Sequence, residues 1–180
     1  GYNPGPGNIA ATHEYDGTNW TTTNNMNTAR ASAAPIAAGI TTAGLVAQND
    51  QSPYKTVESY NGSTWTTESS VANGRSRGNM TGTESAAFLV NGYGIDPGSP
   101  QPGVSTTTTE NYNGSTWTAG TSSLQGTLAS LGMANGNQDN TTIAGGFDQH
   151  PAFVRLSTVQ NYNGTSWVTQ PSMGTARYAG

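Results

Sequence analysis

The sequence predicts an all-β fold built from repeated antiparallel sheets, and three observations support this prediction. An eight-residue pattern, Glu/Gln-x-Tyr-Asn/Asp-Gly-Ser/Thr-x-Trp, occurs four times, and all 4 Trp residues belong to it. Successive copies lie about 45 to 52 residues apart, a spacing typical of β-propeller blades. Only 9% of the residues are charged, so Thr, Ser and Asn supply much of the polar surface, which suits short strands and turns. We therefore expect a β-propeller.

Each copy of the pattern predicts a β-hairpin. The Tyr closes one strand and the Trp opens the next, and the Asn-Gly or Asp-Gly pair between them suits the positive φ angles of a type I′ turn. We expect the two rings at each bend to join neighbouring sheets, because they cover a large area with few torsions to restrain. The four pairs are Tyr15 with Trp20, Tyr60 with Trp65, Tyr112 with Trp117, and Tyr162 with Trp167.

The repeat continues on both sides of the hairpin. An apolar residue follows the Trp, and an Arg follows four positions later. Ahead of three hairpins, apolar stretches that end in glycine predict a second strand at residues 40–44, 87–92 and 142–146. The apolar residues and their Arg partners are Met26 with Arg30, Val71 with Arg75 and Met173 with Arg177, whereas Leu124 is followed by Leu128.

One position of the pattern suggests how the units are held together. Glu58, Glu110 and Gln160 occupy the first position of the later copies, and His13 takes this position in the first copy. We expect each Arg to pair with the Glu, or with backbone carbonyls, of the next unit. This interpretation gives Arg30, Arg75 and Arg177 a role in stability.

Taken together, the apolar strand, Gly-Gly, variable loop, Tyr, turn, Trp, apolar residue and Arg resemble the kelch repeat. The fullest version runs from Ile143-Ala144-Gly145-Gly146 to Arg177, and the short turn is similar to compact kelch-like repeats of bacterial and phage surface proteins. The resemblance implies a galactose-oxidase-like β-propeller of four-stranded blades. Residues 1–180 then form a single domain of about three complete blades and two partial ones. Propellers have about 4–8 blades, so we expect a larger ring, closed by further blades or by other copies of the chain.

Composition excludes several classes of function. A net charge of −4 and a single lysine, Lys55, argue against nucleic acid as a partner, since such surfaces need clustered cations. The absence of cysteine excludes disulfides, a thiolate nucleophile and Cys-ligated zinc. No apolar run approaches the ~20 residues of a membrane span, so we expect no membrane insertion. His13 and His150 lie in different units and the carboxylates are scattered, so we expect no catalytic residue, metal or cofactor.

The variable loops between the second and third strands are the candidate binding regions, because binding residues gather on loops of a rigid scaffold. These loops are expected at residues 45–56, 93–106 and 147–158. Their aromatic rings, carboxylates and cations are suited to holding sugars, and the alternative is that the rings pack onto their own blade. The candidate residues are Asp50, Tyr54, Lys55, Tyr93, Asp96, Phe147, Asp148, His150, Phe153 and Arg155.

The function predicted from these features is a non-enzymatic structural or adhesion module on an extracellular or virion surface, with a protein or a cell-surface glycan as its partner. The virion assignment follows from the resemblance alone. Two alternatives remain open. The chain could belong to a carbohydrate-active or oxidase propeller whose catalytic residues lie outside it, or to an intracellular kelch interaction adaptor.

Overall fold

The computed structural model describes most of the chain as short strands joined by turns and loops. Among the described residues every strand pair is antiparallel and no helix occurs. The described residues are 2–3, 7–31, 42–48, 54–94, 103, 105–125, 128–148 and 154–177.

The third unit is a four-stranded sheet, and the fourth is a five-stranded sheet with four strands in the same order and one further short strand. In both, the Trp-bearing strand lies at one edge and the first strand of the unit at the other. The third unit has the order β13-β12-β10-β9 and consists of β9 (Asn79–Thr83), β10 (Ala86–Val90), β12 (Thr109–Tyr112) and β13 (Trp117–Ala119). The fourth has the order β14-β15-β17-β18, with β14 (Leu128–Asn137), β15 (Asn140–Asp148), β17 (Val159–Tyr162) and β18 (Trp167–Gln170), and β16 (Val154–Arg155) pairs with β15.

The first two units show fewer strands. The second is the sheet β5-β6-β7, and the first is the hairpin β3-β4. The strand expected ahead of β5 would fall at residues 32–41, outside the described residues, as would the second partial blade beyond Arg177. These strands are β3 (Thr12–Tyr15), β4 (Trp20–Thr23), β5 (Gly44–Ala47), β6 (Val57–Tyr60) and β7 (Trp65–Glu68). Two small ribbons pair β1 (Tyr2–Asn3) with β2 (Gly7–Asn8), and β8 (Arg75–Ser76) with β11 (Tyr93–Gly94).

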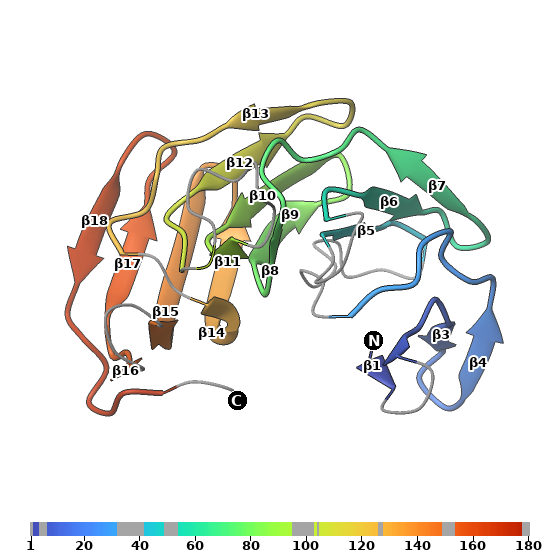
Figure 1. Ribbon diagram of the computed structural model, residues 1–180, viewed down its shortest axis with the longest axis horizontal. Coiled ribbons are helices and arrows are strands. Elements are labelled where there is room, and N and C mark those ends of the chain that lie inside the picture. The colour runs from blue at the N-terminus through green and yellow to red at the C-terminus, as the bar shows by residue number, and fades with distance from the viewer. Residues whose placement is uncertain are drawn as a thin grey trace.

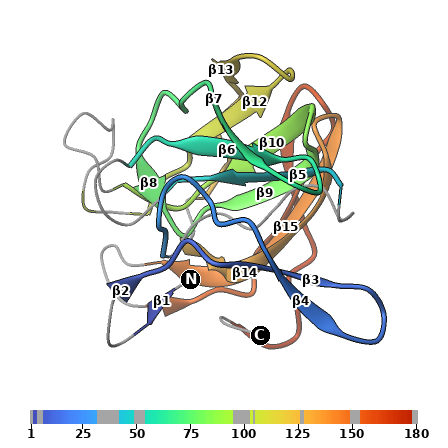
Figure 2. The ribbon, with the colours of Figure 1, turned by 90° about the vertical axis from the view of Figure 1, so that its right-hand side faces the viewer.

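The four units follow one another around an open arc (Figure 1). The Trp-bearing strands β4, β7, β13 and β18 lie on its outside. Seen from the side, the bend of the β3-β4 hairpin projects on one face of the arc, whereas β1, β2 and β8 lie toward the other (Figure 2). We call these the turn face and the loop face.

The four predicted hairpins are present, and in each the Tyr lies directly opposite the Trp. The type I′ prediction is wrong, because that turn needs positive φ at both central residues. Among the described residues of the turns, only the glycine has positive φ, with values of 98°, 90°, 89° and 89° at Gly17, Gly62, Gly114 and Gly164. The Asp or Asn side chain holds the bend instead: Asn61 Oδ1 accepts from the N–H of Ser63 at 3.0 Å and of Thr64 at 2.9 Å.

The strand predicted at residues 40–44 is misplaced, because β5 begins at Gly44 instead of ending there. The backbone conformation shows which residue of the second and third units corresponds to Gly145, the first glycine of the Gly-Gly pair in the fourth unit. Gln48, Asn91 and Gly145 all have positive φ, and each N–H donates to a Thr carbonyl oxygen ahead of the next strand. A glutamine therefore occupies the position where the fourth unit has glycine.

The buried apolar residues form clusters that cross from one unit to the next. Leu45 and Val57 of the second unit share a cluster with Leu89 and Tyr112 of the third. Phe88 of the third unit stacks on Tyr162 of the fourth, with 5.1 Å between the ring centroids. The fold is thus held mainly at the junctions between units, as repeat proteins require.

Candidate functional site

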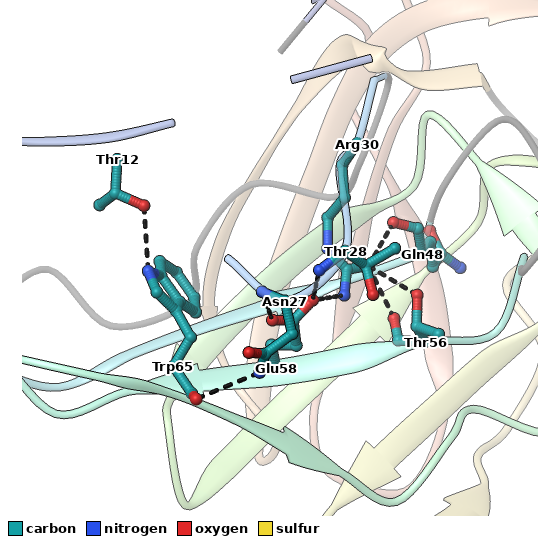
Figure 3. Close-up of polar contacts among 8 residues, drawn as sticks. All are labelled: Thr12, Asn27, Thr28, Arg30, Gln48, Thr56, Glu58 and Trp65. Carbon is teal, nitrogen blue, oxygen red and sulfur yellow. Dashed lines mark hydrogen bonds and ion pairs between the residues drawn. The ribbon is translucent and has the colours of Figure 1, made fainter. Parts of the chain in front are cut away.

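A buried ion pair joins the first unit to the second (Figure 3). Arg30 follows the first hairpin, and Glu58 lies on β6. Arg30 Nη2 donates to Glu58 Oε1 at 2.6 Å, and Nη1 donates to the carbonyl oxygens of Gln48 and Thr56, both at 2.9 Å. Both charged side chains are almost completely buried. A buried charge is tolerated when it is paired and hydrogen-bonded in this way.

The same carboxylate also binds the backbone of the first unit. Glu58 accepts from the N–H of Asn27 at 2.6 Å and of Thr28 at 3.1 Å. Next to it, Trp65 Nε1 donates to Thr12 Oγ1 at 3.0 Å and Asn27 Nδ2 donates to the Trp65 carbonyl oxygen at 3.1 Å (Figure 3). The Glu and Trp of one hairpin are thus both bound to the preceding unit.

The second junction has the same ion pair with poorer hydrogen bonding. Arg75 Nη2 lies 3.2 Å from Glu110 Oε1, and Glu110 accepts from the N–H of Ala72 at 2.7 Å. The buried Nε, Nη1 and Nη2 atoms of Arg75 have no well-aligned acceptor among the described residues. Burial lowers the pKa of Arg75 to about 10, and the charge of Glu110 opposes this shift.

The third junction is neutral. Gln160 replaces the Glu and accepts from the N–H of Leu124 at 2.8 Å and of Gln125 at 3.2 Å. The apolar position of the repeat falls on Ser123 in this unit and not on the predicted Leu124, because the N–H of Ser123 donates to the carbonyl oxygen of Thr107 just as that of Met26 donates to the carbonyl oxygen of Ala10. The residue at the Arg position is then Thr127, which lies outside the described residues, and not Leu128.

At each end of the arc, repeat residues that are buried elsewhere are exposed. Trp20 is 71% exposed and Tyr15 is 47% exposed, whereas Trp65 is 9% exposed and Tyr60 is buried. At the other end Arg177 is exposed, although its backbone pairs with Leu156 as Arg30 pairs with Ile9. Each of these residues faces a side on which the described residues place no neighbouring unit.

The candidate binding residues are only partly in loops. Phe147 and Asp148 belong to β15, where they lie opposite Arg155 and Val154 of β16, and Tyr93 lies in β11 opposite Ser76. Leu45, placed at the start of a loop, is buried in β5. Tyr54 and Lys55 form a half-buried turn before β6. Asp50, Asp96, His150 and Phe153 lie outside the described residues.

Of these candidates, the structure brings Phe147, Asp148 and Arg155 together on the β15-β16 ribbon. Phe147 and Asp148 are half-buried, whereas Arg155 and Val154 are exposed. This ribbon joins an anionic group, a cationic group and an apolar surface.

An open cleft of about 400 Å³ lies on the fourth unit, away from the predicted loops. It is bordered by the β14-β15 turn and the hairpin bend, which places it toward the turn face. Sequence reasoning did not single out its lining residues. Strand alternation was the available signal, because Asn161, Val168 and Gln170 must point away from the side used by Tyr162 and Trp167. The cleft is lined by Asp139, Asn140, Asn161, Tyr162, Asn163, Val168 and Gln170.

The described residues contain no group of three His, Cys, Asp or Glu side chains placed to hold a metal ion. They also contain no helix long and apolar enough to cross a membrane.

These units define an all-β repeat protein of small antiparallel sheets, and its fold is similar to a propeller structure. One similar solved structure is that of YjhT, which matches with a TM-score of 0.70 and 13% sequence identity. The match covers 94% of this chain and 61% of YjhT, so the chain spans about three fifths of that protein's length. At this identity the likeness concerns the fold alone. No protein-family model matches the chain, and no curated protein matches it.

Proposed function

We propose that the chain is part of a kelch-like β-propeller that serves as a non-enzymatic adhesion or structural module on an extracellular or virion surface. Its partner is a protein or a cell-surface glycan, and further blades or other copies complete the ring. The repeated hairpins, the order of strands in the third and fourth units and the likeness to YjhT support the propeller.

The observation that carries the binding proposal is that repeated and variable residues lie in different places and make different contacts. The repeated residues, among them Arg30, Glu58 and Trp65, are used in contacts between units. The units differ from one another mainly on the loop face, where the β15-β16 ribbon places Arg155 and Asp148 beside exposed Val154. Charged groups next to an apolar surface are suited to a polyhydroxylated ligand, which offers both hydroxyl groups and apolar ring faces.

The test is a glycan array followed by titration of any bound glycan with three single variants. We expect Arg155→Ala and Lys55→Ala to weaken binding about tenfold or more, as loss of a charge-assisted hydrogen bond does. Ser115→Ala is the matched control: Ser115 is exposed in the hairpin bend of the third unit, and its hydroxyl makes no hydrogen bond among the described residues. Equal affinity of all three variants would rule out the loop face as the glycan site.

A protein partner would respond differently. Binding of cells or virion proteins that withstands deglycosylation, yet is lost in Arg155→Ala, would assign the same face to a protein. The enzyme and adaptor alternatives have no specific contact among the described residues in their favour.

A further inference from the structure

One side of the fourth unit is open, whereas the corresponding side of each earlier unit is covered by the next hairpin. On β17 and β18, Tyr162 and Trp167 point toward the third unit. Successive residues of a strand point to opposite sides, so Asn161, Val168 and Gln170 point the other way, into the open cleft. We call this side, together with Arg177, the open face of the fourth unit.

In the earlier units, the corresponding side receives the next hairpin. Glu68, three residues after Trp65, accepts from Tyr112 Oη of the third unit at 3.2 Å. Gln170 stands at the same position, three residues after Trp167. The Arg at the end of each of the first two units lies against a carboxylate of the next, Arg30 with Glu58 and Arg75 with Glu110.

At each junction, the Arg of one unit and the Glu of the next hairpin are either both present or both absent. Where the Arg is present, the next hairpin begins with Glu, and where it is absent, the next hairpin begins with Gln160. Arg177 is present and exposed, and its guanidinium has no acceptor among the described residues. The open face therefore has the arginine of an Arg–Glu junction but no glutamate to pair with it.

We propose that the open face of the fourth unit binds a further hairpin of the same repeat, one that carries a carboxylate two residues before its Tyr. The carboxylate pairs with Arg177, and the Tyr and Trp of that hairpin cover the cleft beside Gln170. This inference rests on the repeat architecture in the proposed function, and it does not depend on glycan binding.

The chain's own first hairpin lacks the carboxylate that such a partner carries. Its exposed Tyr15 and Trp20 would supply the rings, but His13 stands where a carboxylate is required. The ring of His13 is already within 3.3 Å of Thr22 Oγ1 on the neighbouring strand. A second copy would thus place an imidazole, which carries no negative charge, where the first two junctions have a carboxylate.

The open face also lacks one contact of the other junctions, which leaves Arg177 as its main specific group. Four residues after each of the first three Trp residues, a side chain donates to a carbonyl oxygen in the next hairpin bend. The fourth unit has Pro171 at this position, and Pro has no side-chain donor. The donors and their acceptors are Asn24 with Ser63, Ser69 with Ser115, and Thr121 with Thr165.

The chain itself supplies the probe for a test, because a single substitution gives its first hairpin the missing acid. Sedimentation velocity and equilibrium would compare the wild type with His13→Glu, with His13→Gln as the uncharged control, and with Arg177→Ala made both in the wild type and in His13→Glu. Circular dichroism would check that each variant is folded. The substitutions lie at exposed positions.

We expect the wild type and His13→Gln not to associate, and His13→Glu to associate at least tenfold more tightly than either. If the two ends of one chain meet instead, His13→Glu will be a monomer with a raised sedimentation coefficient. In both cases Arg177→Ala should reverse the change. No difference between His13→Glu and His13→Gln would overturn the proposal. So would wild-type association that Arg177→Ala abolishes, since an acid would then not be required. A negative glycan array would affect neither result.

Discussion

The first and second hairpins share the same sequence pattern and similar internal geometry, yet they differ in the contacts and burial that depend on neighbouring units. The ring centroids are 5.2 Å apart for Tyr15 and Trp20, and 4.9 Å apart for Tyr60 and Trp65. Trp65 is nevertheless buried and bonded to the preceding unit, whereas Trp20 is 71% exposed. The hairpin is thus a local product of the repeat, and its burial comes from the unit before it.

The largest expected effect is the difference in unfolding free energy between substitution of Trp65 and substitution of Trp20. Trp65→Ala should lower the free energy of unfolding by about 3–5 kcal/mol, because it removes a large buried ring and the bond to Thr12. Trp20→Ala should cost about 1 kcal/mol or less, since it removes a largely exposed ring that packs on Tyr15. Urea denaturation of both variants would measure the difference. Equal losses of unfolding free energy in the two variants would mean that the Trp20 ring is covered by another surface in solution.

A smaller effect is expected at the first position of the pattern. Glu58→Gln should cost about 3 kcal/mol, because Arg30 stays buried without its counter-charge. His13→Gln should change stability by about 0.5 kcal/mol or less, as is usual at exposed positions. The double variant Arg30→Met with Glu58→Gln should recover part of the loss. Denaturant titration of the single and double variants would give the coupling energy, and a coupling near zero would contradict a stabilising ion pair.

The smallest expected effect concerns pH. Asp16 accepts from the N–H of Asn19 and of Thr18, and these bonds lower its pKa below 3.8. A carboxyl group with a lowered folded pKa stabilises the fold above its unfolded pKa and loses this contribution as pH falls through the folded value. The first bend should therefore loosen in acid, whereas the Asn61 bend should not.

Asp16→Asn sharpens this comparison, since it gives the first bend the residue found in the other three. Amide NMR shifts of Thr18 and Asn19 between pH 5 and pH 2 would follow the loosening. They should titrate in the wild type and stay constant in the variant. Equal titration in both would assign the transition to another group.

Local features of the fold were predictable from the sequence, whereas features that depend on contacts between units were not. The pairing of Tyr60 with Trp65 follows from the hairpin pattern, because register is set within a few residues. The turn type was missed because Asn61 uses its side chain to hold the bend, so the positive φ is needed only at Gly62. An Asn-Gly dipeptide is compatible both with a type I′ turn and with a bend held by the Asn side chain.

The misplaced strand and the shifted alignment have a different cause. A glycine lies just after the second strand in the third unit and within it in the fourth, but Gln48 adopts the left-handed conformation in the second unit, so composition gave no signal there. Likewise, Leu124 looked like the apolar residue of the repeat, but the backbone bond of Ser123 sets the position. Hydrogen bonds between segments decide such positions, and a single sequence does not display them. The cleft was missed because its residues matter only in the absence of a neighbouring unit.

The neutral junction at Gln160 restricts how a gene for this protein can gain or lose repeats. Excision of the segment from Ala31 to Arg75 would leave Arg30 facing Glu110, so the new boundary would again join a cation to an acid. Excision of the segment from Ser76 to Thr127 would place Arg75 against Gln160, a buried charge with no counter-charge. Unequal recombination is therefore expected to yield folded products at the first boundary and to be selected against at the second.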